Sequence, residues 1–418
     1  MTLPIDEKIA DIRASLAAET RLVLAAPPGA GKTTRLPIAL LDEPWLAGRR
    51  ILLLEPRRIA ARLAAERMAA TLGERLGDTV GLATRIERQV SRATRIEVVT
   101  DGLAARRLVA DPELSGVGAV LFDEFHERSL PLDLALALAL ESQIALRPDL
   151  RLIIMSATLD TARIATRIKA PVIASEGRQF PVETIYLGRG PEPLEERMAR
   201  AVRRALREHQ GSALAFLPGQ KEILRTAEQL AGVDALVAPL YGALPPAEQD
   251  AATAPAPPGR RKVVLATDIA ESSLTIPDVA IVVDSGLARI ASFDPESGSR
   301  LSTERASRAS VDQRRGRAGR TGPGVCYRLW DEAETRGLPA EPTPEILSAD
   351  LSGLVLTLAE WGERDASRLA FVDPPPPGRL ANAAALLREL GALDASGALT
   401  ARGRDMARLP LDPSLAAM

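Results

Sequence analysis

A short stretch near the N-terminus combines glycines, a lysine and a hydroxyl side chain in an order suited to binding phosphates. The stretch is Ala26-Pro27-Pro28-Gly29-Ala30-Gly31-Lys32-Thr33, which follows an apolar strand pattern and opens a helical one. Glycines let backbone N–H groups wrap around phosphates, and the helix N-terminus adds its dipole. Lys32 can reach the β- and γ-phosphates of ATP, and the Thr33 hydroxyl can bind Mg²⁺.

This stretch therefore predicts a P-loop, although its first position is Ala26, where the usual pattern has glycine. An ordinary strand–turn–helix junction is the alternative. We expect ATP to contact Pro28, Gly29, Ala30, Gly31, Lys32, Thr33 and Thr34.

An acidic pair follows a second apolar strand pattern. Val117–Phe122 leads directly into Asp123 and Glu124. Ligands of parallel α/β sheets bind where the strands end, so the pair is expected at the same rim as the P-loop. A solvated strand end is the alternative for an isolated Asp-Glu pair. We expect Thr33, Asp123 and Glu124 to form the Mg²⁺ site, and Glu124 to polarise the attacking water as general base.

A third candidate is the arginine-rich stretch Gln313-Arg314-Arg315-Gly316-Arg317-Ala318-Gly319-Arg320. Arg317 and Arg320 are three residues apart, so on a helix they point the same way. Planar, permanently charged guanidinium groups can stabilise γ-phosphate charge in a transition state. A solvated basic face and a basic nucleic-acid patch are the alternatives. We expect Gln313, Arg317 and Arg320 to act with Lys32 and Glu124 in catalysis.

The elements that must position these residues alternate between short apolar strands and helical patterns, which indicates an α/β fold with parallel sheets. The pattern restarts near residue 180 and changes again near residue 341. We therefore expect doubly wound lobes at 1–180 and 181–340, and a small domain of helices and a hairpin at 341–418. The strands expected in the first lobe are Arg21–Ala26, Arg50–Glu55, Thr79–Ala83, Arg95–Thr100, Val117–Asp123, Leu150–Ser156 and Ala170–Ala174. Those expected in the second are Val182–Leu187, Ser212–Leu217, Ala235–Pro239, Lys262–Thr267, Val279–Asp284 and Gly324–Leu329.

Composition is ordinary for a folded globular chain. The 418 residues are 46% hydrophobic and 26% charged, with a net charge of −2, so nucleic-acid binding must come from local patches. The lone cysteine, Cys326, excludes an internal disulfide, and no cysteine cluster suggests zinc. The apolar run from Leu130 to Leu140 is too short to cross a membrane. We expect a cytoplasmic monomer that is part of a longer protein.

With these stretches in order, the sequence resembles the superfamily 2 helicases, and within them the DEAH-box class of RNA helicases. The motifs of that class follow one another in order along the chain. They are Ala26–Thr33 (motif I), Glu55–Ala61 (Ia), Thr100–Gly102 (Ib), Asp123–His126 (II), Ser156–Thr158 (III), Phe216–Gly219 (IV), Thr267–Ile276 (V) and Gln313–Arg320 (VI). The resemblance covers essentially the whole chain. It implies two tandem RecA-like P-loop domains followed by a winged-helix domain and the start of a truncated ratchet-like domain.

The resemblance also implies residue roles. The residues expected to contact the nucleic-acid backbone are Arg57, Arg58, Thr100, Asp101 and Thr267. Those expected to couple hydrolysis to lobe movement are His126, Ser156 and Thr158. Further nucleotide contacts fall to Arg67 and Thr275. Taken without the family, the arginine pair could be solvated, the histidine structural, and Ser-Ala-Thr a plain strand end.

Three positions depart from the class. Motif II has Phe125 where Ala is usual, and motif V has Asp268 where Asn is common. Adenine is usually held between an Arg and a Phe in this class. Arg67 fits the first position, but Thr253 stands at the second.

A hairpin at Arg289–Leu301, turning at Asp294–Gly298, resembles one that separates nucleic-acid strands in this class. A plain surface hairpin is the alternative.

The resemblance implies an ATP- and Mg²⁺-dependent helicase that moves 3′-to-5′ on single-stranded RNA. A DNA helicase or translocase is the first alternative, because the motor motifs do not distinguish RNA from DNA. The second is a nucleotide-gated clamp or assembly factor without turnover. Intact Lys32, Glu124, Arg317 and Arg320 disfavour this last reading.

Overall fold

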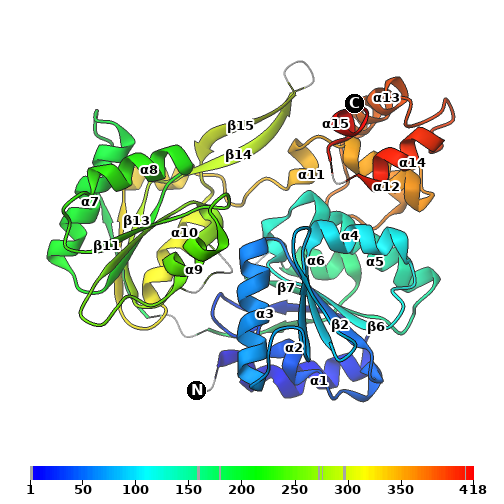
Figure 1. Ribbon diagram of the computed structural model, residues 1–418, viewed down its shortest axis with the longest axis horizontal. Coiled ribbons are helices and arrows are strands. Elements are labelled where there is room, and N and C mark those ends of the chain that lie inside the picture. The colour runs from blue at the N-terminus through cyan, green and yellow to red at the C-terminus, as the bar shows by residue number, and fades with distance from the viewer. Residues whose placement is uncertain are drawn as a thin grey trace.

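The computed structural model describes residues 3–157, 161–177, 180–271, 274, 276–294, 298–409 and 411–418. For 292–294, 298 and 299 it describes the backbone alone. The described chain forms two sheet-containing lobes and a helical C-terminal part, as Figure 1 shows. The expected α/β class, with two doubly wound lobes, is confirmed.

The first lobe is built on one sheet with the strand order β4-β3-β5-β2-β6-β7-β1-β8. Every neighbouring pair is parallel except β3 with the two-residue edge strand β4, which the sequence did not predict. The strands are β1 (Arg21–Ala25), β2 (Arg50–Glu55), β3 (Val80–Ala83), β4 (Arg88–Gln89), β5 (Ile96–Thr100), β6 (Val117–Phe122), β7 (Arg151–Ser156) and β8 (Val172–Ala174). Its helices are α1 (Ile9–Ala18), α2 (Leu36–Ala39), α3 (Arg58–Leu72), α4 (Asp101–Ala110), α5 (Leu130–Ala145) and α6 (Thr161–Ile168).

Alternating side chains of each central strand enter opposite apolar layers. On β2, Ile51 and Leu53 pack with α1, α2 and α3, whereas Leu52 and Leu54 pack with α4, α5 and α6. Strands covered on both faces need continuous apolar runs, which explains the sequence pattern. The apolar run at Leu130–Leu140 lies in α5, which is buried along most of its length. Within the described residues, no helix is long and apolar enough to cross a membrane.

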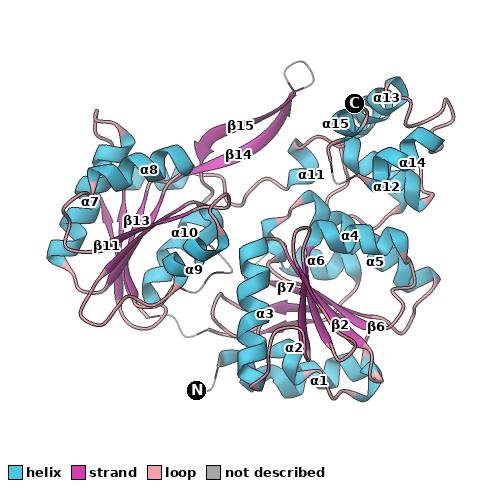
Figure 2. Ribbon diagram, viewed as in Figure 1, coloured by secondary structure: helices cyan, strands magenta, loops and turns pink. Residues whose placement is uncertain are grey.

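The second lobe repeats this design with the all-parallel order β11-β12-β10-β13-β16-β9. Figure 2 shows its helices on both sides of the strands. The strands are β9 (Val182–Tyr186), β10 (Ser212–Phe216), β11 (Leu236–Leu240), β12 (Lys262–Ala266), β13 (Val279–Asp284) and β16 (Gly324–Arg328). The helices are α7 (Leu194–Glu208), α8 (Gln220–Gln229), α9 (Pro246–Thr253) and α10 (Arg308–Gly316).

A two-stranded hairpin leaves this lobe between β13 and α10. Its strands are β14 (Leu287–Asp294) and β15 (Gly298–Arg305), paired antiparallel from Leu287 with Arg305 to Asp294 with Gly298. The expected hairpin is therefore present; residues 295–297 of its predicted turn lie outside the described residues. Figure 1 shows it projecting from the second lobe toward the C-terminal part.

The C-terminal part is helical, with an isolated antiparallel bridge between Leu393 and Leu399 where a hairpin was expected. Its helices are α11 (Glu345–Ser348), α12 (Ser352–Trp361), α13 (Pro377–Glu389), α14 (Ala401–Arg408) and α15 (Pro413–Ala416). Leu354 and Phe371 belong to the same apolar cluster as α4, α5 and α6 of the first lobe. A smaller cluster around Leu387 and Met406 belongs to the C-terminal part alone.

The two lobes meet through α3. Ile59 and Ala60 of this helix join the apolar cluster of the second lobe, together with Ala252 and Ile269. Beside this contact, both guanidinium nitrogens Nη1 and Nη2 of Arg62 donate to the Asp250 carboxylate, at 3.1 and 2.6 Å. Helix α3, which begins within the Glu55–Ala61 motif, thus belongs to one lobe and packs against the other.

Arg314 is a structural residue of the second lobe, although it stands in the arginine-rich stretch. Its side chain is 1% exposed and lies 2.9 Å from Glu271 and 3.0 Å from the fully buried Asp284. Burial alone lowers the pKa of Arg314, but Asp284 and Glu271 outweigh it and raise the pKa above its usual value. Its guanidinium also lies over the Phe216 ring, 5.1 Å from the centroid.

Arg314→Ala should therefore destabilise the second lobe by about 3–5 kcal/mol, because it leaves the Asp284 carboxylate buried without its counter-charge. Denaturant unfolding of the whole chain measures the loss. Arg308→Ala, an exposed position at the start of the same helix, is the matched control and should change stability by less than about 0.5 kcal/mol. Equal effects of the two substitutions would contradict the assignment.

Candidate nucleotide-binding site

The P-loop connects β1 to α2 and places two glycines in the left-handed region. Gly29 has φ 85° and Gly31 has φ 97°, a conformation that favours glycine. A Cβ on Gly31 would also come within 2.8 Å of the Leu3 side chain. Regular helix begins only at Leu36, later than the sequence indicated, and residues 32–35 form turns. Pro37 explains the delay, because it has no N–H to donate to the Thr33 carbonyl.

Lys32 lies among buried carboxylates. Its Nζ is 3.0 Å from Glu124 Oε1 and 3.8 Å from Asp123 Oδ1, and Thr33 Oγ1 donates to Asp123 Oδ2. Lys32, Asp123 and Glu124 are each at most 3% exposed. The sequence-predicted phosphate loop and acidic pair are therefore brought together, at the carboxyl ends of β1 and β6.

Glu55 is a third buried carboxyl group at this site, and sequence reasoning did not single it out. It ends β2 directly beside β6, since Leu54 pairs with Phe122, so Glu55 and Asp123 are neighbours. Burial, then Asp123 and Glu124, raise the pKa of Glu55 well above its usual value. The available signal was a charged residue at the end of an otherwise apolar strand next to the acidic one.

The donor set suits Mg²⁺. This ion prefers hard oxygen ligands, and proteins supply one or two carboxylates while substrate phosphates and water complete the shell. The Thr33 hydroxyl and the Asp123 carboxylate are already in contact, and Glu124 is the next residue. Thr33, Asp123 and Glu124 thus fit the ion as the sequence predicted.

Glu124 is held ionised despite its burial. Burial raises the pKa of Glu124, but Lys32 and His126 outweigh it and lower the pKa to about 2. Its backbone is in the left-handed region, with φ 47°, and it immediately precedes the turn η3 (Phe125–Glu127). An ionised carboxylate at the strand rim can accept a proton from water, as the general-base role requires.

His126 connects the two lobes. Its Nε2 lies 2.9 Å from Nε2 of Gln313 on α10, with donor and acceptor set by the tautomer. On the other side of the ring, Nδ1 is 3.3 Å from the Ala157 N–H, which follows Ser156, and 3.4 Å from Glu124 Oε2. Burial lowers the pKa of His126 below its usual value, and the nearby Glu124 opposes this shift. Ser156 is fully buried at the end of β7, and Thr158 lies outside the described residues.

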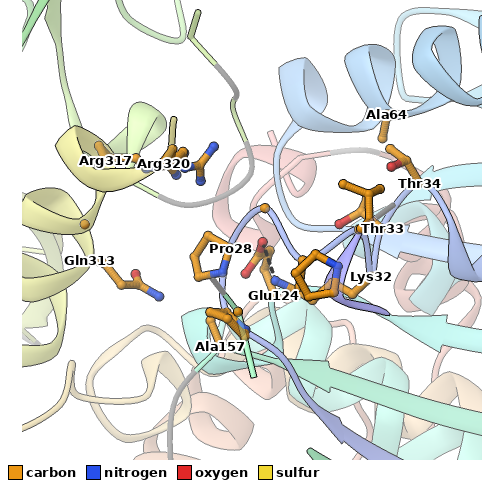
Figure 3. A pocket seen from close by; sticks show the side chains of 18 of the residues that line it. Pro28, Lys32, Thr33, Thr34, Ala64, Glu124, Ala157, Gln313, Arg317 and Arg320 are labelled. Carbon is orange, nitrogen blue, oxygen red and sulfur yellow. Dashed lines mark hydrogen bonds and ion pairs between the residues drawn. The ribbon is translucent and has the colours of Figure 1, made fainter. Parts of the chain in front are cut away.

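Arg317 and Arg320 face the P-loop from the second lobe. Both line the same cleft as Lys32 and Thr33, a space of about 1820 Å³ between the lobes. Figure 3 shows Gln313, Arg317 and Arg320 on one side of the gap, with Pro28, Lys32 and Glu124 on the other. Arg317 Nε donates to the Glu271 carbonyl at 2.9 Å, and Arg320 Nη1 donates to the Leu274 carbonyl at 3.3 Å. Burial lowers the pKa of Arg320 to about 10, so it remains charged at pH 7.

The residues expected near the base line the same cleft. Arg67 of α3 is exposed and lines it, as do Thr253 and Ala254 of the second lobe. The Thr253 hydroxyl donates to the Gln249 carbonyl at 3.0 Å and presents no aromatic face. Thr34 also lines the cleft. Thr275 lies outside the described residues.

The residues expected to touch nucleic acid come from the carboxyl ends of β2, β5 and β12. Arg58 is exposed, Arg57 and Thr100 are half-buried, and Thr267 accepts the Ile269 N–H in a turn. Asp101 differs from its predicted role, because its side chain is buried and accepts hydrogen bonds from the Ser129 hydroxyl and the Gly102 N–H. Sequence position alone did not indicate that this carboxylate turns inward.

Comparison with known proteins agrees with this geometry. The model of the DEAD/DEAH box helicase family matches residues 9–166, and the helicase conserved C-terminal domain matches residues 196–322. The chain belongs to the DEAD/DEAH box helicases. The winged-helix model of the helicase-associated domain matches residues 383–411, within the helical C-terminal part. Both lobes are thus RecA-like domains of this family.

Curated helicases align with nearly the whole chain. It is 50% identical over 426 residues to the ATP-dependent RNA helicase HrpB of Escherichia coli, and 40% identical over 410 residues to the pre-mRNA-splicing factor ATP-dependent RNA helicase prp22 of Schizosaccharomyces pombe. A crystal structure of Escherichia coli HrpB matches 99% of this chain with a TM-score of 0.94 and 49% identity. The chain spans 52% and 35% of the lengths of the two curated helicases, and 54% of the HrpB crystal chain.

Lys32→Ala should destabilise the first lobe, because it leaves the buried carboxylates without their ammonium. A carboxylate whose pKa is raised in the folded state holds a proton that the unfolded chain releases, so stability falls as pH rises. Burial raises the pKa of Glu124 once Lys32 is gone. We expect a loss of about 3–5 kcal/mol near pH 8 and a smaller loss near pH 5, measured by denaturant unfolding.

Two controls sharpen this measurement. The double substitution Lys32→Ala with Glu124→Gln should recover part of the lost stability, because it removes one of the unpaired charges. Lys221→Ala removes an exposed lysine and should have almost no effect at either pH. A loss that does not depend on pH would show that packing, and not charge, explains the effect of Lys32.

Proposed function

We propose that this chain is the motor of an ATP-dependent RNA helicase, which moves 3′-to-5′ on single-stranded RNA and unwinds duplexes. Both relatives named above are called ATP-dependent RNA helicases. The direction of movement follows from the resemblance to the DEAH-box class. Recognition of RNA is expected to be mainly through the backbone, and therefore weakly dependent on sequence and strongly dependent on salt.

One observation supports the motor most directly: the cleft is lined from both lobes by side chains suited to the same phosphates. Lys32 and Thr33 belong to the first lobe, and Arg317 and Arg320 to the second. Arginines brought to a γ-phosphate by a second domain stabilise the charge of phosphoryl transfer. Because the site is complete only when both lobes contribute, hydrolysis and lobe movement become coupled.

The chemistry assigns a task to each side chain. The P-loop backbone and Lys32 hold the phosphates, and Glu124 accepts a proton from the attacking water. Gln313 orients that water, while Arg317 and Arg320 take up the negative charge that develops on the γ-phosphate. Thr33, Asp123 and Glu124 would hold Mg²⁺, which would neutralise phosphate charge. Ser156 and His126 carry the state of the site to Gln313 in the other lobe.

Along the outer rim, Arg57, Arg58, Thr100 and Thr267 are the side chains we assign to the RNA sugar–phosphate backbone. These residues lie at the ends of β-strands from both lobes, so one RNA strand can contact both lobes. An RNA strand bound by both lobes moves when the lobes separate. We assign the protein to the cytoplasm as a monomer.

The decisive experiment is the steady-state rate of ATP hydrolysis with and without single-stranded RNA, and with single-stranded DNA of the same length. We expect strong stimulation by RNA, weaker stimulation by DNA, and loss of both in Glu124→Gln by about 100-fold or more. Equal stimulation by RNA and DNA indicates a translocase that accepts either nucleic acid. A basal rate that neither strand stimulates, or no rate at all, contradicts the proposed RNA motor.

Gln313→Ala should lower the RNA-stimulated rate by roughly 100-fold, because the attacking water loses an orienting group. The KM for ATP should change little, since the phosphates keep Lys32 and the P-loop. Rates at saturating RNA, over a range of ATP concentrations, separate the two parameters.

The contact between Gln313 and His126 allows a matched comparison. If the pair acts as a unit, His126→Ala should also lower the stimulated rate, and the double variant should be little worse than Gln313→Ala. Additive losses would mean that the two side chains act separately, and that His126 does not carry the coupling.

A further inference from the structure

Arg57 is held between two carboxylates that come from different lobes. Its Nε lies 3.0 Å from Glu127 Oε2 in the first lobe, and its Nη2 lies 3.3 Å from Asp268 Oδ2 in the second. Glu127 follows the acidic pair in the turn η3, and Asp268 begins the turn η4 (Asp268–Ala270) after β12. The guanidinium therefore forms an ion pair across the gap between the lobes.

The two carboxylates differ in their access to solvent. The Glu127 side chain is 16% exposed and that of Asp268 is 51% exposed, while Arg57 is 21% exposed. Burial alone lowers the pKa of Arg57, but Glu127 and then Asp268 outweigh it and raise the pKa above its usual value. Glu127 is thus the enclosed partner, and Asp268 occupies the side of the guanidinium that opens to solvent.

That open side coincides with the rim assigned to nucleic acid. Arg57 follows the carboxyl end of β2, and Thr267, another assigned backbone contact, is the residue before Asp268. A phosphate that reaches the Nη2 side of Arg57 from solvent meets the Asp268 carboxylate there. Both groups are anions that seek the same N–H donors, so they compete for them.

From this geometry we propose that Asp268 competes with the nucleic-acid phosphate for Arg57, so that strand binding at Arg57 breaks an ion pair between the lobes. The inference rests on the proposed function, in that it takes Arg57 as a contact to the strand. Asp268 acts through Arg57 as a positioning residue: it lowers strand affinity and couples occupancy of the rim to separation of the lobes at this point.

A second ion pair between the lobes offers an internal comparison. Arg62 and Asp250 are 2.6 Å apart at their nearest atoms, and the Asp250 side chain is 50% exposed, almost the same as Asp268. Neither residue belongs to the assigned strand contacts. Asp250→Asn therefore removes the same charge and the same kind of link as Asp268→Asn, away from the strand.

The test is equilibrium binding of a fluorescently labelled single-stranded oligouridylate to the full chain, without nucleotide. Asp268→Asn should bind about two- to five-fold more tightly than the unaltered chain, the size of one partly exposed ion pair. The gain should shrink at high salt, because it is electrostatic. Asp268→Glu keeps the charge and should keep the original affinity, and Asp250→Asn should not change it.

A double-mutant cycle shows whether Asp268 acts through Arg57. In an Arg57→Ala background, Asp268→Asn should give almost no gain, because the contested donor is gone. The same gain in both backgrounds would mean general repulsion and would overturn the inference. So would no gain from Asp268→Asn, or an equal gain from Asp250→Asn. Damage to the fold would weaken binding, so it cannot imitate the expected result.

The cycle also separates failure of this inference from failure of the proposed function. If the unaltered chain neither binds RNA nor hydrolyses ATP faster with it, the proposed function fails. If the chain binds RNA but Arg57→Ala binds it equally well, the assignment of Arg57 to the strand is wrong and the inference falls with it. If Arg57→Ala weakens binding and Asp268→Asn does not strengthen it, the inference alone fails.

Discussion

The Lys32 ammonium is the charge on which the first lobe's site depends. Three carboxyl groups, from Glu55, Asp123 and Glu124, meet at the ends of two adjacent strands and are almost completely buried. Without a buried cation, such a group of acids would have to take up protons or stay in water. The same ammonium is the group that the P-loop offers to phosphates. Under the proposed function, one side chain therefore both stabilises the lobe and binds the phosphates.

The rest of the site extends this arrangement across the cleft. Glu124 is linked through His126 to Gln313, and the P-loop faces Arg317 and Arg320. The second lobe can present these groups because Arg314, between Glu271 and Asp284, fixes the start of the arginine-rich segment to its core. Arginines of one segment thus differ in their surroundings: Arg314 holds the segment to the core, whereas Arg317 and Arg320 line the cleft.

Much of this could be predicted from the sequence, because the signals are local. The P-loop, the acidic pair and the apolar strands each lie within a few residues, and parallel sheets bring their ends to one rim. What could not be predicted depends on distant neighbours. Glu55 belongs to the site only because β2 lies beside β6, and Asp101 turns inward because Ser129 lies next to it. Likewise, the structural role of Arg314 on α10 depends on Asp284, which ends β13.

The apolar cluster shared by α4, α5, α6 and the C-terminal helices has a mechanical consequence. Leu354 and Phe371 cannot leave this cluster without exposing apolar surface, and Arg128 ties the same face to Asp373 at 2.8 Å. The C-terminal part therefore forms one packed body with the first lobe, whereas β14 and β15 belong to the second lobe. If the lobes move as the proposed function requires, the gap between the hairpin and the C-terminal helices would change as the cleft opens and closes.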